Sequence, residues 1–157
     1  MKLSDFLDRI KLANPNLKAS GVSDTYLTSL INEGCNQVNL LCKVYSGYTD
    51  FNIEANKRIY DLSVSVPLYL GRDKRGFYLK NSGADWKKII PKTEAYISQK
   101  FQDYLNASSV DMPNYYWIEG DELGLYPPPS TAYASGARLY HLKKAVAMSL
   151  DTHYPFS

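Results

Sequence analysis

Three acidic residues crowd one short segment of this 157-residue chain: Glu119, Asp121 and Glu122. Paired carboxylates can act as general acid and general base when an apolar environment raises the pKa of one of them. The surrounding residues, Ile-Glu-Gly-Asp-Glu-Leu over 118–123, are instead typical of a solvated turn between two strands. We therefore interpret the acidic cluster as the tip of a hairpin and not as a catalytic pair.

The other reactive or metal-binding side chains are too few to form a site. His141 and His153 are the only histidines, whereas zinc or iron needs three or four converging ligands. Cys35 and Cys42 lie seven residues apart on an expected helix, about 10 Å from each other, which is beyond disulfide reach. No Gly-x-Ser-x-Gly motif or phosphate loop occurs. The sequence predicts no catalytic residue, no metal and no cofactor.

Basic residues lie in short clusters beside aromatic rings, at Arg72, Lys74 and Arg75 and at Lys87 and Lys88. Cations interleaved with aromatic rings can hold a nucleic-acid backbone and stack its bases. The formal net charge is only +2, so no strong field attracts a polyanion. We predict that these five residues face DNA loosely and non-specifically, with ordinary solvated loops or strand ends as the alternative.

The segment 113–129 is an aromatic hairpin that ends in three prolines. Residues 115–118 alternate between two faces, residues 120–121 supply a two-residue turn, and the chain returns to residue 126. The prolines then end the strand pairing, because proline has no N–H to donate. Tyrosine and tryptophan are enriched at protein interfaces. The residues that we predict to contact a partner, or alternatively to pack the sheet, are Tyr115, Tyr116, Trp117, Tyr126, Pro127, Pro128 and Pro129.

The periodicity of apolar residues predicts an α+β fold in which helices come first. Segment 1–46 is expected to be helical, with a short helix capped by Ser4 and a long helix over about 24–45 capped by Ser23. Gly34 lies inside the apolar stripe of the long helix, which indicates close approach of a neighbouring helix or backbone. The length is sufficient for one domain with a single core, so we expect residues 1–157 to form one domain.

The remainder of the chain is expected to be rich in β-structure. Segment 47–92 alternates with a period of two, which predicts one hairpin over 49–63, a second over 66–80 that turns through 71–76, and a short strand over 86–92. Thr93 then caps a helix over 93–106. Residues 113–143 form the aromatic hairpin and a following strand, and residues 144–157 form a tail.

Two further features of the sequence indicate where in the cell the protein is expected. Two aspartates among the first eight residues interrupt any secretory signal, so we expect synthesis and retention in a cytoplasm. No apolar run approaches the roughly 20 residues that cross a bilayer, and we expect no membrane partner.

Two stretches carry a resemblance to a known family. They are Met112-Pro-Asn-Tyr-Tyr-Trp-Ile-Glu-Gly-Asp-Glu-Leu-Gly-Leu-Tyr-Pro-Pro-Pro-Ser130 and Leu139-Tyr-His-Leu-Lys-Lys144. The first resembles the pattern P-x-x-Y-x-x-E-G-x-x-L-x-L-Y-P-x-P of head–tail adaptor (connector, or head completion) proteins of tailed bacteriophages. The long helix that enters a β-rich segment is similar as well. After residue 144 the chain departs from the family, whose members usually continue into further helices, so we expect a tail or an incomplete sequence.

The resemblance implies a structural virion protein in the neck between capsid and tail, present in the host cytoplasm during assembly. It implies a ring of twelve copies that binds the portal protein and a tail or stopper protein, with genome DNA touching its lumen transiently. The residues alone leave another interpretation open, a small β-rich accessory or carbohydrate-binding module with an aromatic platform. An enzyme is not expected, because the sequence nominates no nucleophile or carboxylate pair.

Overall fold

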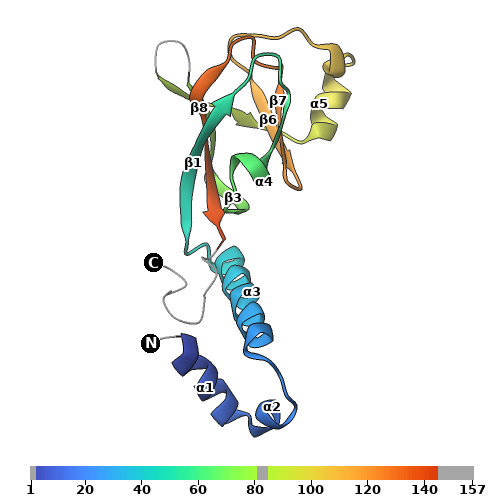
Figure 1. Cartoon of the computed structure of the whole chain (residues 1–157). Helices are drawn as coiled ribbons and strands as arrows, with labels where there is room; N and C mark the ends of the chain where they lie inside the picture. The colour runs from blue at the N-terminus through green and yellow to red at the C-terminus, as the bar shows by residue number, and fades with distance from the viewer. Residues whose placement is uncertain (1–2, 81–84, 145–157) are drawn as a thin grey trace. The chain divides into compact units, whose positions relative to one another are not determined.

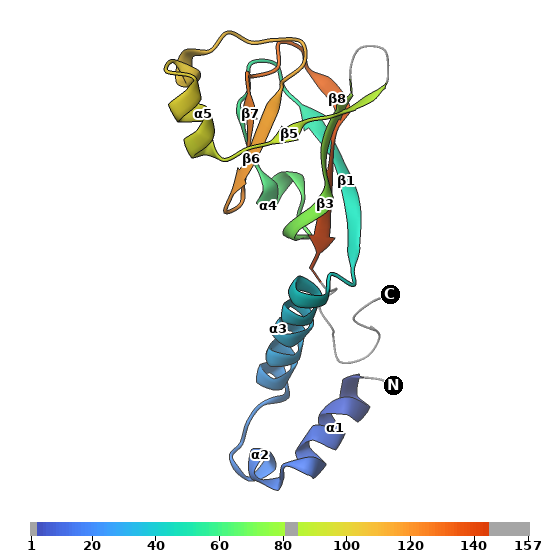
Figure 2. The same cartoon turned by 180° about the vertical axis from the view of Figure 1, so that it is seen from behind.

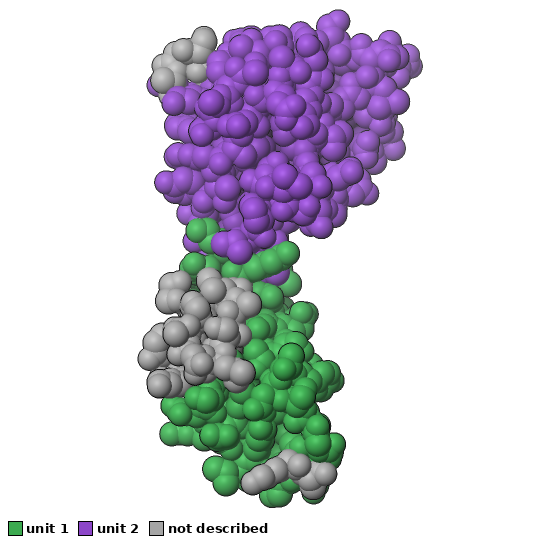
Figure 3. Space-filling view, in the orientation of Figure 1, with its two compact units in different colours: residues 1–45, 142–157 green, residues 46–141 purple. Residues whose placement is uncertain are grey.

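The structure is a computed structural model in which residues 3–80 and 85–144 are described. Contacts group the chain into two compact units, one of residues 1–45 with 142–157 and one of residues 46–141 (Figure 3). The predicted change from helical to alternating pattern near residue 46 coincides with the boundary between these units. The predicted tail beyond residue 144 lies outside the described residues.

The first unit is helical. Its helices are α1 (Leu3–Ala13), α2 (Pro15–Ala19) and α3 (Asp24–Cys42). Helices α1 and α3 pack through Leu3, Leu7 and Leu27, each less than a tenth exposed. Helix α2 was not expected from periodicity, but Pro15 is at its first position, where the missing N–H costs no hydrogen bond.

The Ser23 cap predicted for the long helix is confirmed. The predicted end of the helix near residue 45 and the predicted close packing at Gly34 are not. The Ser23 hydroxyl accepts a hydrogen bond from the Tyr26 N–H at 3.2 Å. Helix α3 ends at Cys42 because Lys43 adopts a left-handed conformation with φ 54°. The close approach predicted at Gly34 is wrong within the described residues, since an added Cβ would meet nothing within 4 Å.

The second unit contains two four-stranded sheets (Figures 1 and 2). The first sheet has the order β1 (Ser46–Ile53), β8 (Tyr133–Lys143), β3 (Tyr69–Lys80) and β4 (Trp86–Lys88). The second has the order β2 (Ile59–Asp61), β7 (Glu122–Tyr126), β6 (Tyr115–Glu119) and β5 (Ile90–Pro91). Helix α5 (Glu94–Lys100) is inserted between β5 and β6, so the α+β fold class is confirmed.

One apolar core lies between the two sheets. Phe77 of the first sheet and Tyr116 of the second are buried there, with ring centroids 5.3 Å apart. Successive residues of a strand point to opposite sides, so each sheet also has an outer face. On the outer face of the second sheet, Ile97 of α5 packs with Trp117 and Tyr126.

The hairpin predicted over 49–63 is wrong. Its two strands belong to different sheets, β1 to the first and β2 to the second. The chain turns into helix α4 (Leu62–Ser65), where the Asp61 carboxylate accepts the Ser63 N–H at 2.7 Å. The alternating pattern marks each strand correctly but carries no information on which sheet the strand joins.

The turn predicted over 71–76 is also wrong, because this segment lies within the 12-residue strand β3. Gly76 has φ +81° there, a conformation that glycine adopts without steric cost. Glycine and charged residues are typical of turns, and this composition led to the wrong prediction. The hydrogen-bonding partners that hold 71–76 in a strand are distant in sequence.

The later elements largely follow the predictions. Thr93 caps α5, its hydroxyl accepting the Tyr96 N–H at 3.1 Å, but the helix stops at Lys100 and a short 3-10 helix follows at Tyr104–Asn106. The segment predicted as one strand over 86–92 is divided between β4 and β5, which belong to different sheets. The aromatic hairpin is confirmed, with Gly120 at φ +56° in its turn.

Candidate functional site

The aromatic hairpin has the predicted alternation, but both of its faces are covered. Tyr116 points to the core between the sheets, and Trp117 and Tyr126 pack under α5. Tyr116 and Trp117 are each 3% exposed, and Tyr126 is 9% exposed. Tyr115 and Pro127 are half-buried. The hairpin side chains therefore serve mainly to hold the unit together, and their contact with a partner stays a prediction.

The prolines that follow the hairpin fasten neighbouring loops. The carbonyl of Pro128 accepts the Val110 N–H at 2.9 Å, and the carbonyl of Pro129 accepts the Asn56 N–H at 2.7 Å. Both prolines are buried. Proline lacks a donor but keeps its acceptor, so this segment ends the strand pairing and still ties two loops to the sheet.

Gly124 allows the Trp117 indole to lie across strand β7. The two residues are directly paired between β6 and β7, and a Cβ added at Gly124 would lie 2.0 Å from Cε2 of the indole. Sequence reasoning missed this contact. The available signal was a glycine inside a strand, which often marks the close approach of another group.

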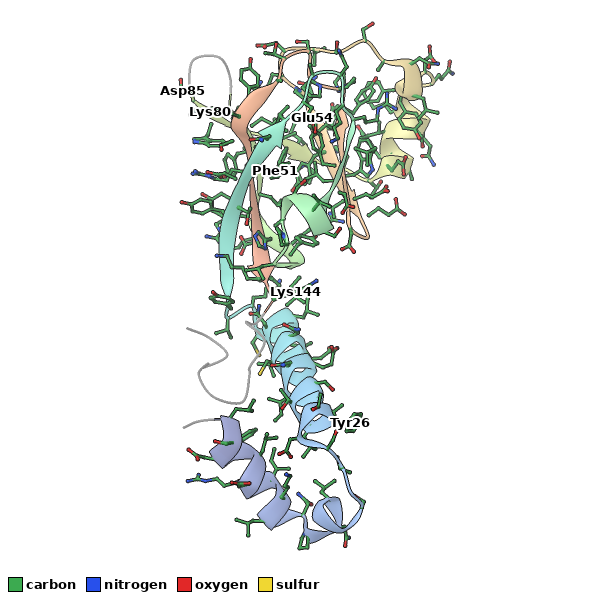
Figure 4. All side chains as sticks on the ribbon, in the orientation of Figure 1. Tyr26, Phe51, Glu54, Lys80, Asp85 and Lys144 are labelled. Carbon is green, nitrogen blue, oxygen red and sulfur yellow. The ribbon has the colours of Figure 1, made fainter. Side chains whose placement is uncertain are left out.

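The exposed candidate site lies on the outer face of the first sheet, which we call the cation–aromatic face. Strand alternation places the apolar residues of β1, β8 and β3 on the core and the charged and aromatic residues on this outer face. Figure 4 shows side chains projecting from this side of the sheet, Lys80 among them. The face consists of Tyr48, Asp50, Asp73, Arg75, Tyr78, Lys80, Trp86, Lys88, Arg138 and Tyr140.

Arg138 is the centre of the cation–aromatic face. Its guanidinium lies 4.2 Å from the ring centroid of Tyr48 and 4.4 Å from that of Trp86. Its Nε and Nη2 each donate to the Asp50 carboxylate at 2.7 Å, and this pairing raises the pKa of Arg138. One side chain of β8 thus joins residues of β1 and β4 by charge-assisted and cation–π contacts.

A second cationic cluster surrounds Tyr140. The Arg75 guanidinium lies 4.5 Å from the Tyr140 ring centroid and donates to Asp73 at 2.7 Å. This hydrogen bond lowers the pKa of Asp73.

Lys80 and Lys88 take part in no ion pair within residues 3–80 and 85–144. They are the two cations of the face that remain available to an acidic partner.

The five basic residues predicted to face DNA do not form one patch. Arg75 and Lys88 lie on the cation–aromatic face, and Lys87 alternates to the other side of β4. Arg72 instead donates to the carbonyl of Ile118 at 2.9 Å, beside the second sheet. Lys74 is exposed. A common role for all five in DNA contact stays a prediction.

The bond between Arg75 and Asp73 is expected to make stability depend on pH. A carboxylate with a lowered pKa in the folded state stabilises the fold above its unfolded pKa of about 3.9. That contribution is lost as the pH falls through the lowered folded pKa. Asp73→Asn should therefore narrow the difference in the free energy of unfolding between about pH 7 and about pH 3, as measured by urea titration. The change should be less than about 1 kcal/mol, since the Arg75 side chain is 41% exposed.

Arg75→Gln is the matched variant, because it removes the same hydrogen bond from the other side. Arg75→Gln should narrow the pH dependence of the free energy of unfolding by a similar amount. Unchanged pH dependence in both variants would contradict the assignment of this effect to the pair.

The described residues include no helix long and apolar enough to cross a membrane. Residues 3–80 and 85–144 also include no group of three or more His, Cys, Asp or Glu that could hold a metal ion.

The family model described as SU10 adaptor protein matches residues 1–156. The chain belongs to this family. It is a family of phage head–tail adaptor proteins, so the resemblance carried by the aromatic hairpin is confirmed. A search of the curated proteins found no match. Membership implies a role as head–tail adaptor with partners in the phage virion, and it directs attention to the exposed surfaces of the adaptor.

Proposed function

We propose that this adaptor is a structural subunit of the phage neck that forms a ring between the portal and the tail. Twelve copies surround a channel through which genome DNA passes, and the ring also binds a tail or stopper protein. The observation that carries the proposal is the match of the adaptor family model to residues 1–156. The near-neutral net charge of +2 suits a channel that must not hold DNA tightly.

Exposed apolar residues on α3 support a role in assembly. Tyr26, Leu30, Val38 and Leu41 are each at least half exposed and follow one another at spacings of three, four or eight residues (Tyr26 is marked in Figure 4). Such spacings place side chains on one side of a helix. Exposed apolar patches often mark sites of protein–protein contact, and we expect these residues to be covered in the assembled particle.

The geometry of the cation–aromatic face argues against a carbohydrate-binding module. Sugar rings stack on the open faces of aromatic side chains. Here the guanidinium of Arg138 lies over Tyr48 and Trp86, and that of Arg75 lies over Tyr140. These arrangements favour contact with a protein partner, since Tyr, Trp and Arg are the residues enriched at interface hot spots.

Native mass spectrometry of the chain mixed with the portal protein of the same phage tests the proposed function. We expect a portal-bound assembly that contains twelve copies of the adaptor, even if the free chain is monomeric. A portal protein from an unrelated phage serves as the control and should bind no ring. A chain that stays monomeric in the presence of its own portal would contradict the proposal.

A further inference from the structure

Three carboxylates lie side by side across three neighbouring strands of the second sheet. Asp61 of β2 pairs with Glu122 of β7, which pairs with Glu119 of β6. Residues directly opposite each other on antiparallel strands share a face of the sheet. Asp121 adds a fourth carboxylate in the adjoining turn, and all four residues are exposed. We call these four residues the acidic row.

The acidic row is electrostatically unfavourable in the isolated chain. Like charges directly opposite each other on paired strands destabilise a sheet. No ion pair among the described residues involves any of the four carboxylates. The Ser63 amide and hydroxyl both donate to Asp61 at 2.7 and 2.6 Å, which favours its charged form. A cationic surface that covered the row would remove this repulsion.

The acidic row and the cation–aromatic face lie on opposite sides of the second unit. Glu119 and Glu122 point to the same side of their strands as Trp117 and Tyr126, which is the outer face of the second sheet. The cation–aromatic face is the outer face of the first sheet, and the shared core separates the two. One unit therefore presents a basic surface on one side and an acidic surface on the other.

We propose that the cation–aromatic face of one copy binds the acidic row of the next copy. A ring of identical subunits joined head to tail requires two different, complementary surfaces on each subunit, and charge complementarity identifies these two. Lys80 and Lys88 face the carboxylates of the neighbour, and the aromatic rings around Arg138 supply contact area. The inference rests on the proposed ring and assigns the surfaces that close it.

Charge reversal on each surface tests the contact. Lys80→Glu with Lys88→Glu makes both surfaces acidic, and Glu119→Lys combined with Asp121→Lys and Glu122→Lys makes both basic. Each of these two charge-reversed variants should lower the population of rings at least about tenfold, because like charges then meet at every contact. Mixing the two variants should restore rings, since alternating copies bring opposite charges together at every contact and twelve is an even number.

Lys87→Glu is the matched control, because it reverses a charge on the same strand as Lys88 but on its other side. Rings should persist in this variant. Circular dichroism of every variant checks that a missing ring does not reflect a missing fold.

Native mass spectrometry of rings, free or on the portal, separates the outcomes. Loss of rings in both charge-reversed variants with recovery on mixing supports the contact. Rings that persist in both, or that are lost without recovery on mixing, overturn it and leave the proposed function standing. Intact rings that no longer bind the portal would assign the face to the portal and also overturn the contact. A wild-type chain without rings on its own portal overturns the proposed function and the contact together.

Discussion

Replacing Gly124 by alanine is expected to destabilise the β-rich unit by about 3 kcal/mol. The added Cβ would lie 2.0 Å from the buried indole of Trp117, so the ring must move away from the surface that it fills against α5. The indole is 3% exposed and packs with Ile97 and Tyr126, so its movement disturbs these contacts. Urea unfolding followed by tryptophan fluorescence measures the loss, because Trp117 itself reports on its environment.

Gly34→Ala is the matched control, since it adds the same methyl group at a glycine with nothing within 4 Å. Alanine is the better helix former by about 1 kcal/mol, so circular dichroism should show equal or higher stability. Equal destabilisation by the two substitutions would contradict the role of the Trp117 contact.

Replacing Asn39 by alanine is expected to destabilise the helical unit by about 3 kcal/mol. The Asn39 side chain is fully buried. Its amide donates to the carbonyls of Tyr45 at 3.0 Å and Lys143 at 2.8 Å, and its oxygen accepts the Tyr45 N–H at 2.6 Å. Removal leaves three backbone groups without this partner, and a buried unsatisfied polar group costs about 1 to 3 kcal/mol.

Thermal unfolding followed by circular dichroism measures this effect, and hydrogen exchange at the Tyr45 amide locates it. Gln37→Ala is the control on the same helix, because the exposed Gln37 side chain donates a hydrogen bond to the Glu33 carboxylate at 2.9 Å and fills no buried position. That substitution should change stability by less than about 0.5 kcal/mol. The opposite outcome is an Asn39→Ala variant as stable as Gln37→Ala, with the Tyr45 backbone amide still protected from hydrogen exchange. That result would contradict the claim that the Asn39 side chain holds Tyr45 and Lys143 together.

The aromatic residues of the hairpin over 113–129 indicated a surface for contact with a partner. In the structure that hairpin is mostly buried, with Trp117 under α5 and Tyr116 in the core. The exposed aromatic surface comes from Tyr48, Trp86 and Tyr140, which are distant in sequence. Burial depends on which elements cover a strand, and that arrangement is set by the whole fold.

Local patterns determined by themselves the features that depend on neighbouring residues. The caps at Ser23 and Thr93 and the turn at Gly120 are decided by hydrogen bonds and backbone angles within a few residues. The periods of the apolar residues likewise specified α1, α3, α5 and most strands, but neither α2 nor α4. The aromatic motif over 113–129 was sufficient to indicate the adaptor family.

Only the tertiary structure decided which strands pair and which carboxylates become neighbours. It also decided which backbone groups the buried Asn39 side chain binds. Segment 71–76 is a strand because distant strands supply its hydrogen-bonding partners, and β1 and β2 separate into different sheets because each finds its partner elsewhere. Asp61 meets Glu122 only through the pairing of β2 with β7. These contacts join residues far apart in the chain. The free energy that favours them comes from burial of the core that both sheets share, and this burial depends on residues from the whole unit, so a short segment of sequence cannot predict it.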